Sequence, residues 1–344
     1  MKTKILYTVL ALLAVHLAAA QILWSENFDN LTLGNVGTDH TGNTPGQGDW
    51  HTLSQSSEIP SENSNDYFKI VSEPGRGKVL ELAATPGKGR TFLQKRGIDA
   101  LWNTRTPGND VLKIEIDFYT GDQFSDGGTG LPTPGALLVL KPNETFDATS
   151  NDVIGNFGYY PNQEIFTLYG IKNCSYNTGI VTSLKLKTWV KVIFYLDFSS
   201  QKYYTLIPAN NAIYSCTLDS TTKVTSFLLR SSNAIGSQAI IPKYKYDNFI
   251  ISAVDTVPLS VEEWVSSKFN VFPNPAKDVI TITNSENIGI EELTVYDING
   301  KVVKLQKSNN ENEIQLNIES FATGNYLLHI KTKEETAVKK IIKK

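Results

Sequence analysis

The sequence predicts an all-β protein made of two successive β-sandwiches. Three observations support this prediction. Short runs alternate apolar and polar residues, Gly- and Pro-rich clusters separate these runs, and the residue pattern changes after Trp264. The 344 residues exceed the usual length of one domain, and 40% hydrophobic residues are enough to fill packed cores. The formal net charge of -3 excludes the basic excess that duplex nucleic acid requires, so no nucleic-acid partner is expected.

Residues 1–20 read as a signal peptide. Lys2 and Lys4 precede an apolar run that ends in Ala18-Ala19-Ala20, the small-residue pattern of a cleavage site. The apolar run is shorter than the roughly 20 residues that span a bilayer, so we expect no transmembrane segment after signal removal. The expected route leads through the periplasm to a secreted or outer cell-surface location.

The cysteines and histidines are too few for a zinc cluster. The chain has two cysteines and four histidines, so a Cys/His metal site is excluded. Export passes through an oxidising environment, which predicts a disulfide between Cys174 and Cys216. Closing a loop of about 40 residues would stabilise the fold by on the order of 4 kcal/mol in the chain-entropy model.

Residues 21–255 are expected to form the larger, two-sheet sandwich. Strands are predicted at 22–28, 67–72, 78–83, 111–119, 135–140, 165–171, 181–187, 190–198, 203–208, 225–230 and 244–252. The run from Val190 to Phe198 places valine, phenylalanine and leucine on one face and Lys191 on the other. No amphipathic helix of convincing length is found in this region.

Residues 269–344, after a linker over 256–268, are expected to form a small immunoglobulin-like sandwich. Six or seven short alternating segments follow one another within about eighty residues. Two of them flank Asn299-Gly300, the strongest short hairpin signal.

This second region closely resembles the type A C-terminal sorting domain of the type IX secretion system of Bacteroidota. Four blocks appear in the family's order: V-F-P-N-P-A at Val271–Ala276, V-Y-D-I-N-G-K at Val295–Lys301, G-N-Y-L-L at Gly324–Leu328, and the K-K-I-I-K-K tail. The resemblance implies that residues 269–344 are an export address that the type IX machinery binds. An ordinary immunoglobulin-like module would share the strand pattern without these blocks.

The larger region resembles concanavalin A-like and laminin G-like jelly rolls in three places. These are Leu23–Asp29, Trp189–Phe198 with the turn after it, and Tyr246–Phe249. The resemblance implies a concanavalin A-like jelly-roll sandwich. Members of these families include lectins, glycosidases, polysaccharide lyases and adhesive domains, so the fold leaves the chemistry open.

Glu115 and Asp117 are the candidate catalytic residues. The retaining glucanases of this fold carry a nucleophile, a helper aspartate and an acid/base glutamate along one strand, and Glu115, Asp117 and Tyr119 share a strand face. Tyr119 and Thr120 stand where the second glutamate belongs. We therefore expect an ordinary polar strand face and no catalytic site.

Aromatic residues in loops predict a glycan site. Trp102 is followed by Asn103 and Arg105, whose side chains could bind sugar hydroxyls, while Tyr159 and Tyr160 stand in another Gly- and Pro-flanked stretch. The predicted function is a non-catalytic module that binds a polysaccharide or surface glycan. A glycoside hydrolase or polysaccharide lyase on the same fold, and an adhesin without a sugar site, remain as alternatives.

Any structural metal is expected to be calcium, because oxygen ligands are plentiful and thiolate or imidazole clusters are absent. The resemblance to jelly rolls implies that the first and last strands pair, which would bring Glu26 or Asp29 near Asp247. Solvated turn aspartates are the alternative explanation of these residues.

Overall fold

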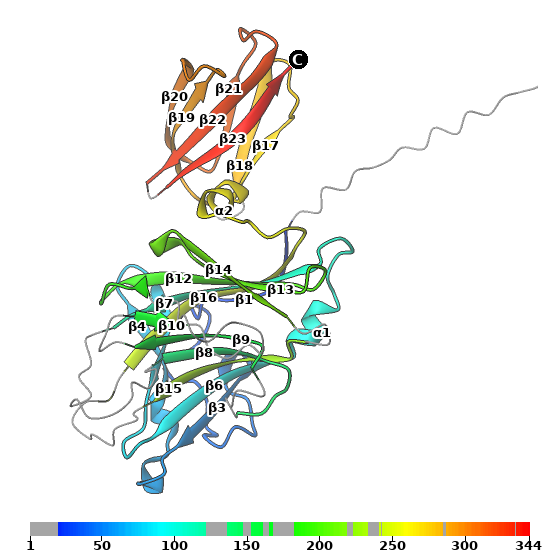
Figure 1. Ribbon diagram of the computed structural model, residues 1–344. Coiled ribbons are helices and arrows are strands. Elements are labelled where there is room, and N and C mark those ends of the chain that lie inside the picture. Colours follow the sequence, from blue (N-terminus) through cyan, green and yellow to red (C-terminus); the bar gives the residue numbers. More distant parts are fainter. Residues whose placement is uncertain are drawn as a thin grey trace, which may run out of the picture.

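Two β-sandwiches joined by a segment with one short helix make up the protein (Figure 1). The computed structural model describes residues 20–121, 136–146, 153–160, 165–167, 182–218, 223–232, 241, 243–284, 287–333 and 335–344. The predicted signal peptide lies outside the described residues, apart from Ala20. Within the described part of the chain, no helix combines the length and apolar character that crossing a membrane requires.

The larger sandwich consists of two antiparallel sheets. The first sheet runs in the order β14 (Ala212–Thr217), β13 (Lys202–Ile207), β12 (Trp189–Asp197), β7 (Val111–Tyr119), β16 (Lys243–Val254), β5 (Gly77–Ala83), β4 (Phe68–Glu73) and β2 (Gly34–Asn35), with β1 (Gln21–Glu26) also paired to β16. The second sheet runs β11 (Thr182–Ser183), β10 (Ile165–Thr167), β9 (Gly155–Tyr160), β8 (Ala136–Lys141), β15 (Ser226–Ser232), β6 (Arg90–Arg96) and β3 (Trp50–Gln55).

The core lies between these two sheets. Alternate residues of β7 and β12 point into it, among them Ile116 and Phe194, as the alternation of the sequence predicts. Trp50 of β3 is fully buried, with ring centroids 5.5 Å from Phe227 and 5.4 Å from Phe249. This aromatic cluster ties the second sheet to the last strand of the first sheet.

The first and last strands of the larger sandwich pair, as the resemblance implies. Strand β1 runs antiparallel to the second half of β16, while the first half of β16 pairs with β5. The register of β16 against β7 shifts between Asp247 and Ile250, and Asn248 has a φ of 49° there. At this bulge the Asn248 side chain reaches Asp117 and the Asp247 side chain reaches Arg76, as described below.

The smaller sandwich contains a three-stranded and a four-stranded sheet. The order is β17 (Phe269–Phe272), β18 (Val279–Asn284), β21 (Glu313–Asn317) in the first and β20 (Val302–Glu311), β19 (Ile290–Tyr296), β22 (Gly324–Thr332), β23 (Thr336–Lys343) in the second. The predicted hairpin around Asn299-Gly300 joins β19 to β20. Its turn is wider than two residues. Within the turn, Asp297 Oδ1 accepts hydrogen bonds from the backbone N–H groups of Asn299 (2.8 Å) and Lys301 (3.0 Å).

Helix α2 (Val261–Ser267) lies between the two sandwiches (Figure 1). Ser260 Oγ accepts a hydrogen bond from the backbone N–H of Glu263 and caps its N-terminus. Trp264 and Val265 are buried in an apolar cluster that also holds Ile193 and Leu206 from the outer face of the larger sandwich and core residues of the smaller one. The two sandwiches therefore share one continuous apolar contact.

The predicted all-β fold class, a jelly-roll sandwich followed by a small sandwich, is confirmed. Five strands of the larger sandwich were not predicted from the sequence: β2, β3, β6, β9 and β14. Strand β6 shows the reason, because two of its polar residues, Gln94 and Lys95, are buried. Gln94 donates a hydrogen bond to Ser226 Oγ (2.9 Å), and Lys95 donates one to the backbone oxygen of Gly48 (3.2 Å). Polar residues of this kind break the alternation on which strand prediction depends.

Candidate functional site

Glu115 and Asp117 lie on the outer face of the first sheet, opposite the core-facing Ile114 and Ile116. The predicted division of β7 into two faces is therefore correct. The outer face is not a solvated one, however, because Glu115 is 4% exposed and Asp117 is 7% exposed. Buried carboxylates need compensating charges, and the neighbouring strands supply them.

Asp117 receives three donors from three different segments. Arg76 Nη1 lies 2.9 Å from its Oδ2, Lys191 Nζ lies 3.0 Å from its Oδ1, and Asn248 Nδ2 donates to Oδ2 at 2.9 Å. Burial acts to raise the pKa of Asp117, but the Lys191 ammonium and the donated hydrogen bonds outweigh it and leave the pKa below its ordinary value. Asp117 is therefore held as a carboxylate.

Asp247 shares the same arginine. Arg76 Nη1 lies 3.0 Å from Asp247 Oδ2, and the backbone N–H of Asn248 donates to Oδ1 at 2.8 Å. Burial raises the pKa of Asp247 despite these contacts. The guanidinium carbon of Arg76 also stacks 4.0 Å from the ring centroid of Trp189, so this arginine joins two carboxylates and an aromatic ring. Trp189 is partly exposed on this outer face.

Glu115 pairs with a neighbour on its own strand, since Lys113 Nζ lies 2.8 Å from Glu115 Oε2. Each of the two candidate catalytic carboxylates is thus matched by a cation. A retaining glycosidase needs one carboxyl group that keeps its proton at working pH and a second that attacks. The ion pairs around Asp117 and Asp247 form a network that joins β7, β12 and β16 to the β4–β5 turn carrying Arg76.

Three of the predicted glycan-binding residues line one cavity. Trp102 at the end of α1 (Ile98–Trp102), Asn103 and Arg105 border a cavity of about 220 Å³ together with Asp99, Phe198 and Lys223, among others. Trp102 packs against Phe198 with ring centroids 5.4 Å apart, and the Arg105 guanidinium carbon lies 4.4 Å from the Trp102 ring centroid.

Asp110, which does not line the cavity, holds Arg105 over the Trp102 ring. Its Nη2 lies 3.1 Å from Asp110 Oδ1, and its Nε donates to the same oxygen at 3.3 Å. Asn103 is exposed at the rim and closes the helix by donating its backbone N–H to Asp99 O (3.1 Å). The cavity thus combines an indole and a guanidinium group that are held in place with an amide, an ammonium group and the Asp99 carboxylate. We call it the Trp102 pocket.

The expectation of a loop aromatic at Tyr159 is wrong. Tyr159 lies in β9 with its ring fully buried, and its ring centroid is 5.3 Å from that of Phe118. It is a core residue because β9 pairs with β8 in a register that points Tyr159 inward. The side chain of Tyr160 lies outside the described residues.

Cys174 also lies outside the described residues. No described cysteine is free, and the disulfide between Cys174 and Cys216 stays a prediction.

The predicted calcium ligands do not form a cage. Glu26 Oε1 accepts from the Phe28 N–H at 2.7 Å, Asp29 Oδ1 accepts from the Lys78 N–H at 2.9 Å, and Asp247 pairs with Arg76. The described residues contain no group of three or more His, Cys, Asp or Glu side chains that could hold a metal ion. Calcium binding by Glu26, Asp29 or Asp247 therefore stays a prediction.

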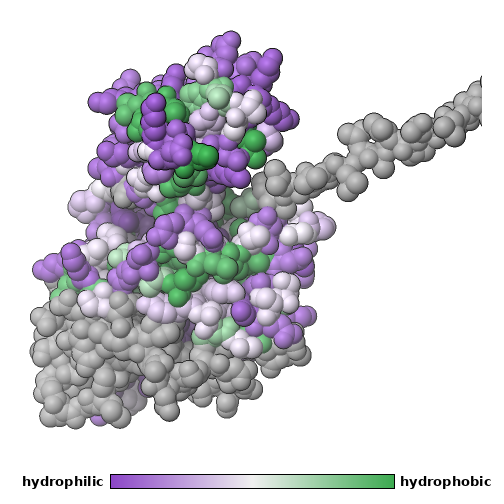
Figure 2. Space-filling view, turned by 45° about the horizontal axis from the view of Figure 1, so that its top comes forward, coloured by the Kyte–Doolittle hydropathy of each residue, from purple (hydrophilic) through white to green (hydrophobic). Residues whose placement is uncertain are grey.

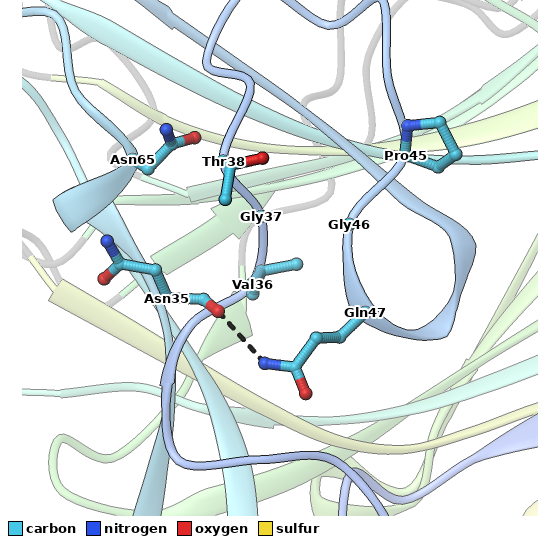
Figure 3. A pocket seen from close by; sticks show the side chains of 8 residues that line it. All are labelled: Asn35, Val36, Gly37, Thr38, Pro45, Gly46, Gln47 and Asn65. Carbon is cyan, nitrogen blue, oxygen red and sulfur yellow. Dashed lines mark hydrogen bonds between the residues drawn. The ribbon is translucent and has the colours of Figure 1, made fainter.

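A second cavity, which the sequence analysis did not identify, lies beside β2. Its volume is about 540 Å³, and carboxamide and hydroxyl side chains line much of it: Asn35, Thr38, Gln47 and Asn65 (Figure 3). We call it the amide pocket. Its residues come from three separate loops of the Gly- and Asn-rich early region, so no local motif predicts that they meet.

A comparison with protein families identifies the smaller sandwich. Residues 270–344 match the family described as "Secretion system C-terminal sorting domain". The match confirms the predicted sorting domain. Curated proteins contain no match to the sequence.

Three solved structures that are similar to the chain share little sequence with it. A sialidase is 12% identical with a TM-score of 0.39, over 65% of this chain and 19% of the sialidase chain. The Emp47p carbohydrate recognition domain is 11% identical with a TM-score of 0.37, over 69% of this chain and 97% of that one. A GH131 β-glucanase catalytic domain from Podospora anserina is 11% identical with a TM-score of 0.39, over 70% and 98% of the two chains. At these scores we take no residue role from them.

Proposed function

We propose that this protein is a non-catalytic glycan-binding module that a type IX secretion system delivers to the cell surface or the medium. The match of residues 270–344 to a C-terminal sorting domain supports the export part of the proposal. The Trp102 pocket supports the binding part, and it is the observation that carries it. Three residues selected from the sequence for sugar contact border one cavity in the folded chain.

The groups of the Trp102 pocket suit a sugar ring. An indole offers an apolar surface to the C–H side of a pyranose, and Asn103 offers both a donor and an acceptor to hydroxyl groups. Arg105 and Lys223 add cationic donors at the border of the cavity. Because Arg105 and Phe198 hold the indole in place, binding would cost little side-chain entropy.

The ion-pair network around Asp117 argues against one role for this residue, that of the general acid of a glycosidase. A general acid must carry a proton near neutral pH, whereas the cations around Asp117 keep that carboxyl group ionised. We assign the network to the stability of the first sheet.

The smaller sandwich offers an exposed surface to the secretion machinery. Figure 2 shows hydrophobic patches among hydrophilic side chains on this sandwich. Its four-stranded sheet exposes several aliphatic side chains, namely Val302, Leu305, Leu327 and Val338. Exposed aliphatic groups on one sheet are typical of an interaction surface, and the sorting domain is the part of the chain that must be bound during export.

A glycan array probed with residues 21–344 tests the binding part of the proposal. We expect one glycan class to bind, with Trp102→Ala lowering the affinity at least tenfold and Trp102→Phe restoring part of it. Tyr296→Ala, on the sorting domain, serves as the matched aromatic control and should bind like the wild type.

Two results would contradict this proposal. Unchanged glycan binding by a folded Trp102→Ala variant would show that the Trp102 pocket does not bind the glycan. Release of reducing ends from a bound polysaccharide, lost in Glu115→Gln, would establish the glycosidase alternative.

A further inference from the structure

The amide pocket is separate from the Trp102 pocket. In the first sheet, β7 borders the Trp102 pocket through Leu112, whereas β2, which carries Asn35, is the edge strand four positions away. Four strand spacings of about 4.8 Å separate the two places by about 19 Å. A ligand in one pocket therefore does not occupy the other.

The Gln47 side of the amide pocket is fixed before any ligand arrives. The Gln47 carboxamide is fully engaged, since Nε2 donates to the backbone oxygens of Thr32 and Asn35, both at 3.0 Å, and Oε1 accepts from the Thr32 N–H. The backbone N–H of Gln47 donates to Val36 O at 2.7 Å. The loops on either side come so close that a Cβ at Gly46 would collide with that same carbonyl oxygen. Glycine is therefore required at this position.

Two carboxamides of the pocket have unused capacity for hydrogen bonds. Asn35 Nδ2 donates to Asp66 Oδ1 at 3.2 Å, which orients its carboxamide. Within the part of the chain that the structure describes, the buried Oδ1 of Asn65 has no hydrogen-bond partner. Figure 3 shows the Asn35 and Asn65 side chains on the same side of the pocket, near Thr38. Leaving a buried acceptor without a partner is unfavourable. A rotation of the Asn65 side chain that brings its Oδ1 to a hydrogen-bond donor of a ligand is therefore favoured.

The chemistry of the lining restricts the class of ligand. None of the eight lining residues, all of them described, carries an ionisable side chain. Carboxamide and hydroxyl groups bind neutral donors and acceptors, and they do not compensate a buried charge. The volume of about 540 Å³ falls within the range of small-ligand pockets. We infer that the amide pocket is a second binding site, for a neutral polyhydroxylated ligand of one or two sugar units.

This inference extends the proposed glycan binding to a second site, but it does not depend on the Trp102 pocket. The test is calorimetric titration of residues 21–344 with a panel of neutral methyl glycosides and with glucuronate. At least one neutral glycoside should bind. Asn65→Leu and Thr38→Val should each weaken its binding at least tenfold, while the control Tyr296→Ala should leave this binding unchanged.

Asn65→Leu is close to isosteric and removes a buried acceptor that has no partner, so we expect it to fold. Thr38→Val gives an independent variant if it does not. Binding that only Trp102→Ala abolishes would overturn this inference and leave the proposed function standing. The absence of any neutral glycoside binding, or stronger binding of glucuronate that Asn65→Leu abolishes, would also overturn it.

Discussion

Replacing Asp117 by asparagine should destabilise the larger sandwich much more than the same change at Asp247. Removing one partner of a buried ion pair typically costs 3–5 kcal/mol. The cations that Asp117 compensates are about a quarter exposed, at 24% for the Arg76 side chain and 27% for Lys191, so they can recover part of their hydration. We therefore expect a loss of about 2–3 kcal/mol for Asp117→Asn.

Asp247→Asn should lower the free energy of unfolding by about 1 kcal/mol or less, because the introduced side chain still accepts a hydrogen bond and burial already disfavours the charge of Asp247.

The pH dependence of the two changes has opposite signs. Asp117 has a folded pKa below the ordinary 3.8, so its contribution is present above that pH and is lost as the pH falls through the folded pKa. Asp247 has a raised pKa, so its ionisation destabilises the fold as the pH rises through the folded value.

The measurement is denaturant unfolding followed by tryptophan fluorescence at pH 7 and at about pH 3, with Asp255→Asn as the exposed control. The difference between the wild type and Asp117→Asn should shrink at the lower pH. A loss below about 0.5 kcal/mol for Asp117→Asn at pH 7, the size of an ordinary surface change, would refute the reasoning. So would a larger loss for Asp247→Asn.

Four further outcomes are expected. Glu115→Gln should cost about 1–3 kcal/mol, because the change leaves the partly buried Lys113 ammonium without its counter-charge, and thermal or chemical unfolding would measure it. Trp50→Ala should cost about 3–5 kcal/mol, as for other fully buried aromatic residues, and a loss under 1 kcal/mol would contradict the position of this ring at the centre of the core. A chain truncated before Val271 should keep the larger sandwich folded but should stay in the periplasm, and its secretion at the wild-type level would refute the export assignment. Thiol titration of the denatured, non-reduced exported protein should find Cys174 and Cys216 oxidised, whereas two free thiols would exclude the disulfide.

Local patterns of the sequence determined the all-β class and the sorting domain. The strands at Val190 and Val111 were found because alternation with a period of two depends only on the residues themselves. The sorting domain was found because four blocks stand in a fixed order along the chain, and the family match over residues 270–344 agrees with them. Both kinds of signal are contained within short stretches of sequence.

The tertiary structure decided which of the candidate residues meet. Trp102 and Tyr159 look alike in the sequence, yet strand register buries Tyr159 in the core while Trp102 borders a cavity. The sequence predicts Asp117 on an ordinary polar strand face, and only the fold brings Arg76, 41 positions away in the chain, to it. The amide pocket likewise joins Asn35 to Asn65. Strand register and loop closure set these distances, and both depend on the packing of the whole sandwich, which no short stretch of sequence contains.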